Sequence, residues 1–210
     1  MLIVGLTGGV ASGKTTVSRV LREEGAYVVD ADRIARELVR PRAPAWKELV
    51  KAFGTDILRE DGSIERKKLA GKVFADLQQR KLLNQILHPR IGREMNRRTK
   101  EIWKKDPEAI VVIDAPLLVE LGGHHKMDRL IVVTTTRAQQ IDRLRKRDGI
   151  SRQGALRIIS SQMPVEDKVK LADFVIRNDG SLQDTKEKAK EIFRELKKTR
   201  SSHKEKMRSV

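Results

Sequence analysis

Short, unbroken hydrophobic runs mark two regions of the chain, the first 40 residues and the part after residue 108. The runs cover residues 2–6, 26–29, 109–113, 130–133 and 174–176. Runs without polar alternation are typical of parallel strands that are covered on both faces. Hydrophobic residues at helical spacing predict helices over residues 16–24, 34–39, 137–147, 152–161 and 182–198. This order of strands and helices predicts an α/β fold with a parallel sheet.

The middle of the chain has a different pattern, because strand-like runs are missing between residues 41 and 106. Helical periodicity covers residues 45–53, 66–74, 79–87 and 90–105, with Lys and Arg on the polar side. His88 and Pro89 separate the last two of these helices. We interpret this part as a helical insertion into the α/β core.

A glycine-rich loop follows the first hydrophobic run. Gly8, Gly13, Lys14 and Thr15 fit the pattern G-x-x-x-x-G-K-[ST] of a phosphate-binding loop. The glycines let backbone N–H groups converge on an anion, and the following helix directs its positive end to the same point. Lys14 would reach the β- and γ-phosphates and Thr15 would bind Mg²⁺. The loop predicts binding of a nucleoside triphosphate.

Acidic residues follow two of the predicted strands. Asp30 and Asp32 come after the second run, at the sheet edge where α/β proteins bind ligands, and one of them could act on an attacking hydroxyl. Capping of the next helix is an equally good interpretation of either acid. Asp114 closes the third run, as a Walker B acid that takes part in holding Mg²⁺ does.

Five arginines lie close together near residues 148 and 149. A helical flap that carries them could close over ATP, although a solvated charged face explains most of them individually. They are Arg143, Arg145, Arg147, Arg152 and Arg157.

Composition adds a strongly basic balance. Lys and Arg number 45 and Asp and Glu number 29, which gives a net charge of +16. This charge suits either a nucleic acid or a phosphate-rich small molecule. The few aromatic residues are not interleaved with basic runs, so no nucleic-acid partner is expected. The absence of cysteine excludes disulfides and thiolate metal sites. With neither a signal peptide nor a membrane span recognisable, we expect a cytoplasmic protein that does not bind membranes.

Several motifs together resemble the dephospho-coenzyme A kinase family. G-L-T-G-G-x-x-x-S-G-K-[ST] occupies residues 5–15, D-A-D residues 30–32 and H-P-x-I residues 88–91. D-x-P-L-L-x-E occupies residues 114–120, and Q-I-x-R-L-x-x-R-D-G-I-S occupies residues 140–151. Gln162, Lys168 and Asn178 follow in the order of the family. The likeness covers residues 1 to about 198.

The resemblance implies a P-loop, nucleotide-kinase-like core of three layers with a five-stranded parallel sheet. Residues 1–40, 109–136 and 172–198 would form this core, and residues 41–108 a helical part that binds coenzyme A. Residues 137–171 would form a helical lid. Outside the likeness, the polar and basic composition of residues 199–210 predicts a basic tail that is frayed or disordered.

The resemblance also implies the reaction and its residues. ATP with Mg²⁺ would phosphorylate the ribose 3′-hydroxyl of dephospho-CoA, with Asp32 as general base. The catalytic residues would be Asp32, Lys14, Arg143 and Arg147. ATP would be bound by Gly9, Val10, Ala11, Ser12, Gly13, Lys14, Thr15, Thr16 and Asn178. The substrate would be bound by Thr7, Asp32, His88, Arg90, Asp114 and Leu117, and the metal by Thr15 and Asp114.

One departure from the family pattern concerns the loop itself. Ala11 replaces a more common glycine, so a positive φ angle at this position is less favourable. Two alternatives stay open: another small-molecule kinase that acts on nucleosides or nucleotides, and an NTPase that binds nucleic acid. We expect a monomer or a weak homo-oligomer.

Overall fold

The computed structural model describes residues 1–208, and the side chains of these residues except 74, 75 and 201–208. The chain forms two compact units. The first contains Met1–Val29 and the chain from Glu101 onward, and the second contains Asp30–Lys100.

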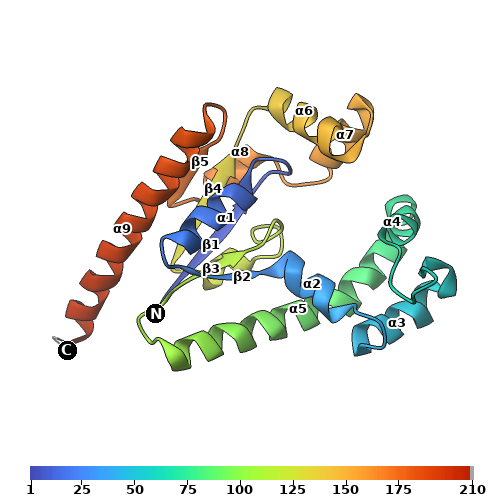
Figure 1. Ribbon diagram of the computed structural model, residues 1–210, viewed down its shortest axis with the longest axis horizontal. Helices are drawn as coiled ribbons and strands as arrows, with labels where there is room; N and C mark the ends of the chain where they lie inside the picture. The colour runs from blue at the N-terminus through green and yellow to red at the C-terminus, as the bar shows by residue number, and fades with distance from the viewer. Residues whose placement is uncertain (209–210) are drawn as a thin grey trace. The chain divides into compact units, whose positions relative to one another are not determined.

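A five-stranded sheet forms the centre of the first unit (Figure 1). Its strands are β1 (Leu2–Gly8), β2 (Tyr27–Asp30), β3 (Ile110–Asp114), β4 (Arg129–Thr134) and β5 (Phe174–Arg177), in the order β2-β3-β1-β4-β5. β1 pairs in parallel with both β3 and β4, and β4 pairs in parallel with β5. The predicted α/β fold with five strands is therefore confirmed. The strand order reverses at β1, which is where open sheets of this kind bind ligands.

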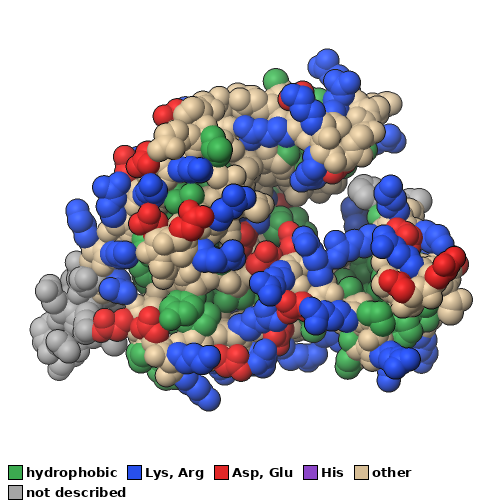
Figure 2. Space-filling model, in the orientation of Figure 1, with side chains coloured by type: hydrophobic (Ala, Val, Ile, Leu, Met, Phe, Trp, Pro, Cys, Tyr) green, Lys and Arg blue, Asp and Glu red, His purple; other side chains and the backbone are tan. Residues whose placement is uncertain are grey.

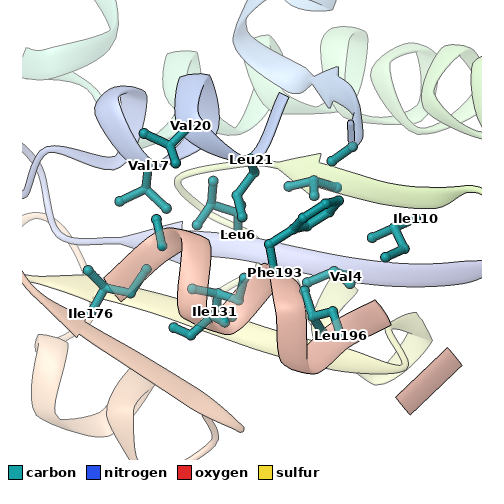
Figure 3. Packing of buried hydrophobic residues seen from close by; sticks show 14 of the residues in the cluster. Val4, Leu6, Val17, Val20, Leu21, Ile110, Ile131, Ile176, Phe193 and Leu196 are labelled. Atoms are coloured by element: carbon teal, nitrogen blue, oxygen red, sulfur yellow. The ribbon is translucent and has the colours of Figure 1, made fainter. Parts of the chain in front are cut away.

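Helices α1 (Lys14–Glu23) and α9 (Leu182–Arg208) supply hydrophobic side chains to one face of the sheet. Figure 3 shows Leu21 of α1 and Phe193 of α9 packed with Leu6 of β1. The segment after β3 covers the other face so closely that a Cβ atom at Gly5 would lie 2.6 Å from Leu118 Cδ2. All five residues of β3 are buried, as the unbroken hydrophobic run predicts.

The rest of the first unit is helical. It contains the 3₁₀ helix η2 (Gly123–Lys126) and the helices α6 (Arg137–Asp148), α7 (Arg152–Ser160) and α8 (Val165–Val169). The side chains of Thr136 and Ser151 cap α6 and α7 by accepting backbone N–H bonds. The hydrophobic pattern does not predict α8, because this helix is only five residues long.

The second unit is built from α2 (Ala31–Leu38), α3 (Pro44–Phe53), the 3₁₀ helix η1 (Thr55–Ile57), α4 (Arg66–Ala75) and most of α5 (Leu77–Lys105). It has its own hydrophobic core, in which Leu49, Phe53, Ile57 and Ile86 are buried. The expectation that strands are missing from this part agrees with the structure, where an isolated bridge joins Leu58 to Ile64.

The predicted break at His88 and Pro89 is wrong, because α5 runs through Pro89 without interruption. Proline inside a helix removes one hydrogen bond and costs about 3 kcal/mol. Leu82, Ile86 and Leu87 pack into the core of the second unit just before the proline. Their burial holds this part of the helix in place and offsets the cost.

The predicted end of the last helix at Lys198 is also wrong, whereas the expectation that residues 199–210 are frayed or disordered stays a prediction. α9 continues to Arg208, since no glycine or proline interrupts residues 182–208. Arg200 Nη1 donates to the backbone oxygen of Glu108 at 2.7 Å and ties this part of the helix to the first unit. Residues 209 and 210 lie outside the described part of the chain. Among the described helices, none is long and apolar enough to cross a membrane.

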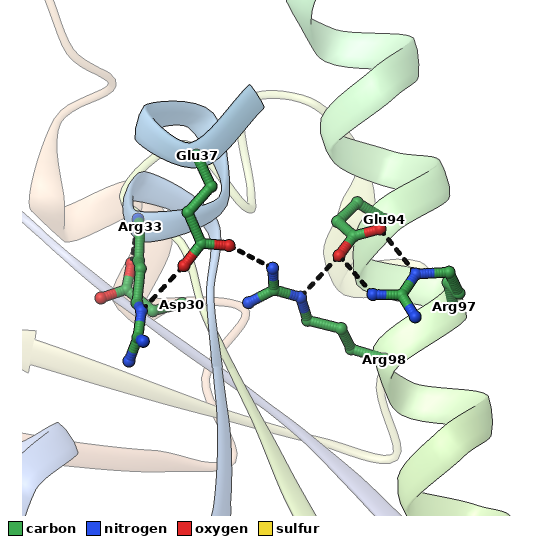
Figure 4. Close-up of polar contacts among 6 residues, drawn as sticks. All are labelled: Asp30, Arg33, Glu37, Glu94, Arg97 and Arg98. Atoms are coloured by element: carbon green, nitrogen blue, oxygen red, sulfur yellow. Dashed lines mark hydrogen bonds and ion pairs between the residues drawn. The ribbon is translucent and has the colours of Figure 1, made fainter. Parts of the chain in front are cut away.

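Ion pairs connect α2 and α5 within the second unit (Figure 4). Arg98 pairs with Glu37 of α2 and, through Nε at 2.8 Å, with Glu94 of its own helix. Arg97 also pairs with Glu94 at 2.8 Å. Hydrogen bonds from Arg97 and Arg98 lower the pKa of Glu94 to about 2. Because the native state binds this proton more weakly than the unfolded chain does, the network stabilises the fold most at neutral pH.

We predict that Glu94→Gln makes the unfolding free energy of the chain less dependent on pH. The pKa of Glu94 is depressed from 4.5 to about 2, so its contribution is complete above pH 4.5 and disappears as the pH falls towards 2. At pH 7 the variant should lose about 1 kcal/mol of unfolding free energy. Urea unfolding of the variant and of wild type between pH 7 and pH 3 measures the difference, which should shrink below pH 4.5.

Glu23→Gln is the matched control, because Glu23 is exposed on α1. Its difference from wild type should be small at every pH. A loss in Glu94→Gln that stays constant from pH 7 to pH 3 would contradict the assigned role of this carboxylate.

Candidate active site

The glycine-rich loop joins β1 to α1, and its glycines allow close contacts with other segments. Gly13 caps α1 in the left-handed region with φ 92°. A Cβ atom here would lie 2.0 Å from Asn178 Nδ2. At Gly9 a Cβ atom would lie 2.6 Å from Gln140 Nε2. Both glycines are therefore needed for side chains from distant parts of the sequence to reach the loop.

Three successive carbonyl groups of the loop accept hydrogen bonds from such side chains. Gln140 Nε2 donates to the oxygen of Val10 at 2.8 Å. Arg143 Nη1 donates to the oxygen of Ala11 at 3.2 Å, and Asn178 Nδ2 donates to the oxygen of Ser12 at 2.8 Å. We call these three side chains the carbonyl donors. They fix the orientation of three peptide units in the loop.

Fixed carbonyls also fix the N–H groups, because the two point in opposite directions in a trans peptide. The N–H groups of Ala11 and Gly13 share peptide units with the bound oxygens of Val10 and Ser12, so they face the other side of the backbone. The first turn of α1 adds its own N–H groups and the positive end of the helix dipole. This arrangement suits a phosphate group.

Asn178 and Arg143 support each other at this site. Asn178 is 7% exposed, and its Oδ1 accepts a hydrogen bond from Thr185 of α9 at 2.9 Å. Its backbone oxygen accepts from Arg143 Nη2 at 3.0 Å. Both predicted site residues therefore contact the loop backbone. Arg147 does not: it forms a two-point pair with Asp148 at 2.8 Å, which raises the pKa of Arg147.

Lys14 and Asp114 form an ion pair at the start of α1 and the end of β3. Asp114 is 4% exposed and lies opposite Leu6 of β1 in the sheet. Leu6 is the residue that precedes Thr7. Burying a carboxylate is unfavourable unless it is paired, so Lys14 supplies the counter-charge. The two predicted residues are thus brought together, and they place one positive and one negative group next to the loop.

The remaining predicted residues of the first unit differ in exposure. Thr7 is fully buried, and its hydroxyl donates to the oxygen of Pro116 at 2.9 Å. Thr15 is exposed in the first turn of α1, and Leu117 is 40% exposed. Thr16 donates its backbone N–H to the oxygen of Gly13 at 2.9 Å and continues the helix.

The donor set fits Mg²⁺ held together with a nucleotide. Thr15 and Asp114 offer oxygen atoms, which are the ligands that Mg²⁺ prefers. Among the described residues, no group of three or more His, Cys, Asp or Glu side chains could hold a metal ion. Mg²⁺ in kinases is bound by one or two protein ligands plus substrate phosphates, so a cage made of protein alone is not required.

The second unit contains Asp30, Asp32 and a cavity. Asp30 caps α2, since its Oδ1 accepts the N–H of Arg33 at 2.9 Å. Asp32 is exposed in the first turn of the same helix and lines a cavity of about 520 Å³. The cavity has an apolar part and a polar part. The apolar part includes Val39, Leu49, Ile64, Leu69, Leu83 and Leu87, and the polar part Asp32, Arg36, Arg40, Ser63 and Arg66.

His88 and Arg90 lie on α5, outside the set of residues that line this cavity. Arg90 pairs with Glu48 of α3 and donates from Nη1 to the oxygen of Ile86 at 2.6 Å. Burial lowers the pKa of His88, because desolvation disfavours the charged imidazolium.

Two site residues were missed by the sequence reasoning. Gln140 is one of the carbonyl donors, and Gln162 Oε1 accepts the N–H of Val10 at 2.9 Å. The N–H group and the carbonyl group of Val10 are therefore both hydrogen-bonded to glutamine side chains. Gln140 is 6% exposed, and a polar residue on the buried side of a helix was the signal that could have identified it.

A parallel sheet that reverses at β1, a phosphate loop after that strand and an acid at the end of β3 together define a P-loop kinase. Comparisons with known proteins specify the family. The family model described as dephospho-CoA kinase matches residues 2–184. The dephospho-CoA kinase of Bacillus thuringiensis subsp. konkukian is 46% identical over 193 residues, which are 92% of this chain and 96% of that protein.

Solved structures agree with this match. The dephospho-CoA kinase from Campylobacter jejuni aligns with a TM-score of 0.63 and 26% identity, over 92% of this chain and 96% of that one. TT1252 from Thermus thermophilus aligns with a TM-score of 0.76 and 31% identity, over 93% and 97% of the two chains. The chain belongs to the dephospho-CoA kinase family, whose members phosphorylate dephospho-CoA with ATP in the last step of CoA biosynthesis.

Ala11 has a positive φ of 57°, so the unfavourable conformation expected from its sequence position is present. We predict that Ala11→Gly raises the unfolding free energy by about 0.5–1 kcal/mol, because glycine avoids the left-handed penalty and loses only part of that gain to chain entropy. Urea unfolding without nucleotide measures this change.

Ala138→Gly is the matched control. Ala138 is exposed in α6, so the same chemical change should lower stability by about 0.5–1 kcal/mol. Two variants that lose stability equally would show that Ala11 is not strained.

Proposed function

We propose that this enzyme transfers the γ-phosphoryl group of ATP to the ribose 3′-hydroxyl of dephospho-CoA, giving CoA and ADP. The observation that carries the proposal is the set of carbonyl donors, which leaves loop N–H groups next to Lys14 in a chain of this family. Phosphoryl transfer depends on positioning and charge stabilisation more than on covalent chemistry. The loop supports both requirements.

On the donor side, Lys14 and the loop N–H groups would stabilise charge on the transferred phosphoryl group. Thr15 and Asp114 would hold Mg²⁺, which neutralises charge on the β- and γ-phosphates when bound. Arg143 would act by bracing the loop through the oxygen of Ala11. Arg147 would have to break its ion pair with Asp148 in order to bind a phosphate group. Residues 137–171, which carry Arg147, would then serve as a lid.

On the acceptor side, the cavity of the second unit suits a long substrate with both apolar and anionic parts. Dephospho-CoA has a pantetheine arm and a diphosphate. The leucine and isoleucine side chains would contact the arm, and Arg36, Arg40 and Arg66 would attract the diphosphate. This supports assigning residues 41–108 to the binding of coenzyme A.

Asp32 is the proposed general base for the 3′-hydroxyl. It lines the cavity, whereas the carboxylate of Asp30 is occupied as the cap of α2. The sequence left helix capping and catalysis open for both acids. In this proposal Asp30 caps the helix and Asp32 takes part in catalysis.

The nucleic-acid alternative receives less support. On the face shown in Figure 2, Lys and Arg are scattered among Asp and Glu rather than gathered on one element. A cytoplasmic location and a monomeric or weakly oligomeric state stay predictions from the sequence.

We predict that the wild-type enzyme phosphorylates dephospho-CoA but not adenosine or guanosine, and that Lys14→Ala lowers the rate by at least about 10²–10³-fold. Product is measured by phosphate analysis at the 3′ position. The urea midpoint is measured as well, because Asp114 loses its buried counter-charge.

Lys188→Ala, an exposed change on α9, is the control and should keep the wild-type rate. Turnover of Lys14→Ala close to wild type would exclude the loop as the donor site. Equal rates with nucleosides would exclude the proposed acceptor.

A second prediction separates the two acids. Asp32→Asn should slow single-turnover phosphorylation by about 10²–10⁴-fold while both substrates bind normally. Asp30→Asn keeps an oxygen that can cap α2, so its rate should change by less than about threefold. Rapid-quench kinetics and separate binding titrations measure both. If Asp30→Asn loses the chemical step and Asp32→Asn keeps it, the base is assigned to the wrong residue.

A further inference from the structure

Lys168 on α8 is fully buried, with a side-chain exposure of 0%. None of the roles described above uses it. Its Nζ lies 2.7 Å from Glu120 Oε1 and donates to the oxygen of Pro116 at 3.0 Å. Lysine is almost never fully buried unless it is paired, so these two partners account for its position.

The oxygen of Pro116 accepts two hydrogen bonds, one from Lys168 and one from the hydroxyl of Thr7 at 2.9 Å. Pro116 comes two residues after Asp114, and Thr7 comes immediately before Gly8 of the phosphate loop. One carbonyl therefore connects three segments: the end of β1, the segment after β3, and α8. The ammonium group is the only charged member of this connection.

The segment around α8 also reaches the loop from its other end. Gln162, which lies between α7 and α8, accepts the N–H of Val10 at 2.9 Å. The stretch from Gln162 to Lys168 is thus fastened both to the phosphate loop and to the segment that carries Asp114. One short stretch of chain therefore contacts both of these parts of the donor site.

We propose that Lys168 is a positioning residue for phosphoryl transfer, whose ammonium group holds Pro116 and thereby the Thr7 hydroxyl and the Asp114 carboxylate in register with the phosphate loop. The proposal rests on the donor site described under the proposed function. It assigns Lys168 no contact with either substrate. Its loss should therefore affect the rate of transfer more than the binding of ATP.

The test separates a role in positioning from a role in stability by removing the charges of both Lys168 and Glu120. Lys168→Met alone leaves Glu120 without its counter-charge and should lower the urea midpoint. Lys168→Met with Glu120→Gln replaces a buried pair by neutral side chains of similar size, a change that is often neutral for stability. Glu120→Gln alone is the matched control.

The measured quantities are the urea midpoint, the ATP dissociation constant and the single-turnover rate with dephospho-CoA. In the double variant we expect a midpoint close to that of wild type and ATP affinity within about threefold, but a rate about 10–100-fold below that of Glu120→Gln, since small displacements of reacting groups slow transfer strongly. A double variant whose rate equals that of Glu120→Gln would overturn the proposal, because Lys168 would then serve stability alone. A rate that falls only in proportion to ATP affinity would overturn it too.

If the methionine variants do not fold, Lys168→Leu with Glu120→Gln replaces them, since leucine is shorter than methionine and likewise cannot donate to the oxygen of Pro116. Its rate should lie between those of Glu120→Gln and the Lys14→Ala variant, and a rate equal to Glu120→Gln would again overturn the proposal. Failure of the proposed function would appear separately, as an absence of dephospho-CoA phosphorylation in the wild-type arm.

Discussion

The phosphate loop must direct backbone N–H groups towards an anion, and every peptide unit that does so turns its carbonyl group the opposite way. Those carbonyls need partners, because unpaired backbone groups are costly where water is excluded. In this chain the partners are Gln140, Arg143 and Asn178, which lie 130 to 166 residues after the carbonyl groups that they bind. The rest of the first unit is arranged so that these side chains arrive at the right place.

This requirement explains features that would otherwise be separate. Gly9 and Gly13 are small because Gln140 and Asn178 occupy the space of a Cβ atom. Asn178 follows β5 directly, so pairing of β5 with β4 brings it to the loop. Gln140 and Arg143 are three positions apart on α6 and therefore project from one face of the helix. Any movement of α6 must therefore either break these hydrogen bonds or move the loop together with the helix.

Much of the fold could be predicted from the sequence, since the five hydrophobic runs correspond to the five strands. The loop and Asp114 could be predicted as well, because their residue types and positions after strands are local features. The continuation of α5 through Pro89 could not, as it depends on packing of Leu82 and Ile86 in the second unit. The same is true of α8 and of the hydrogen bonds of Gln140, Gln162 and Lys168. These contacts join residues that are far apart in sequence, and a single sequence has no periodic signal for them.

The pair of Lys14 and Asp114 places a further constraint on what can bind. Asp114 is almost completely buried, so separating the pair would remove the ammonium counter-charge from a buried carboxylate unless another cation took its place. Lys14 likewise needs a new anion if it leaves Asp114. A phosphate group alone would satisfy Lys14 without replacing the counter-charge of Asp114, and a metal ion alone would do the reverse. A nucleotide that arrives together with a divalent cation satisfies both charges at once, so charge balance within this pair favours the combined ligand over either part.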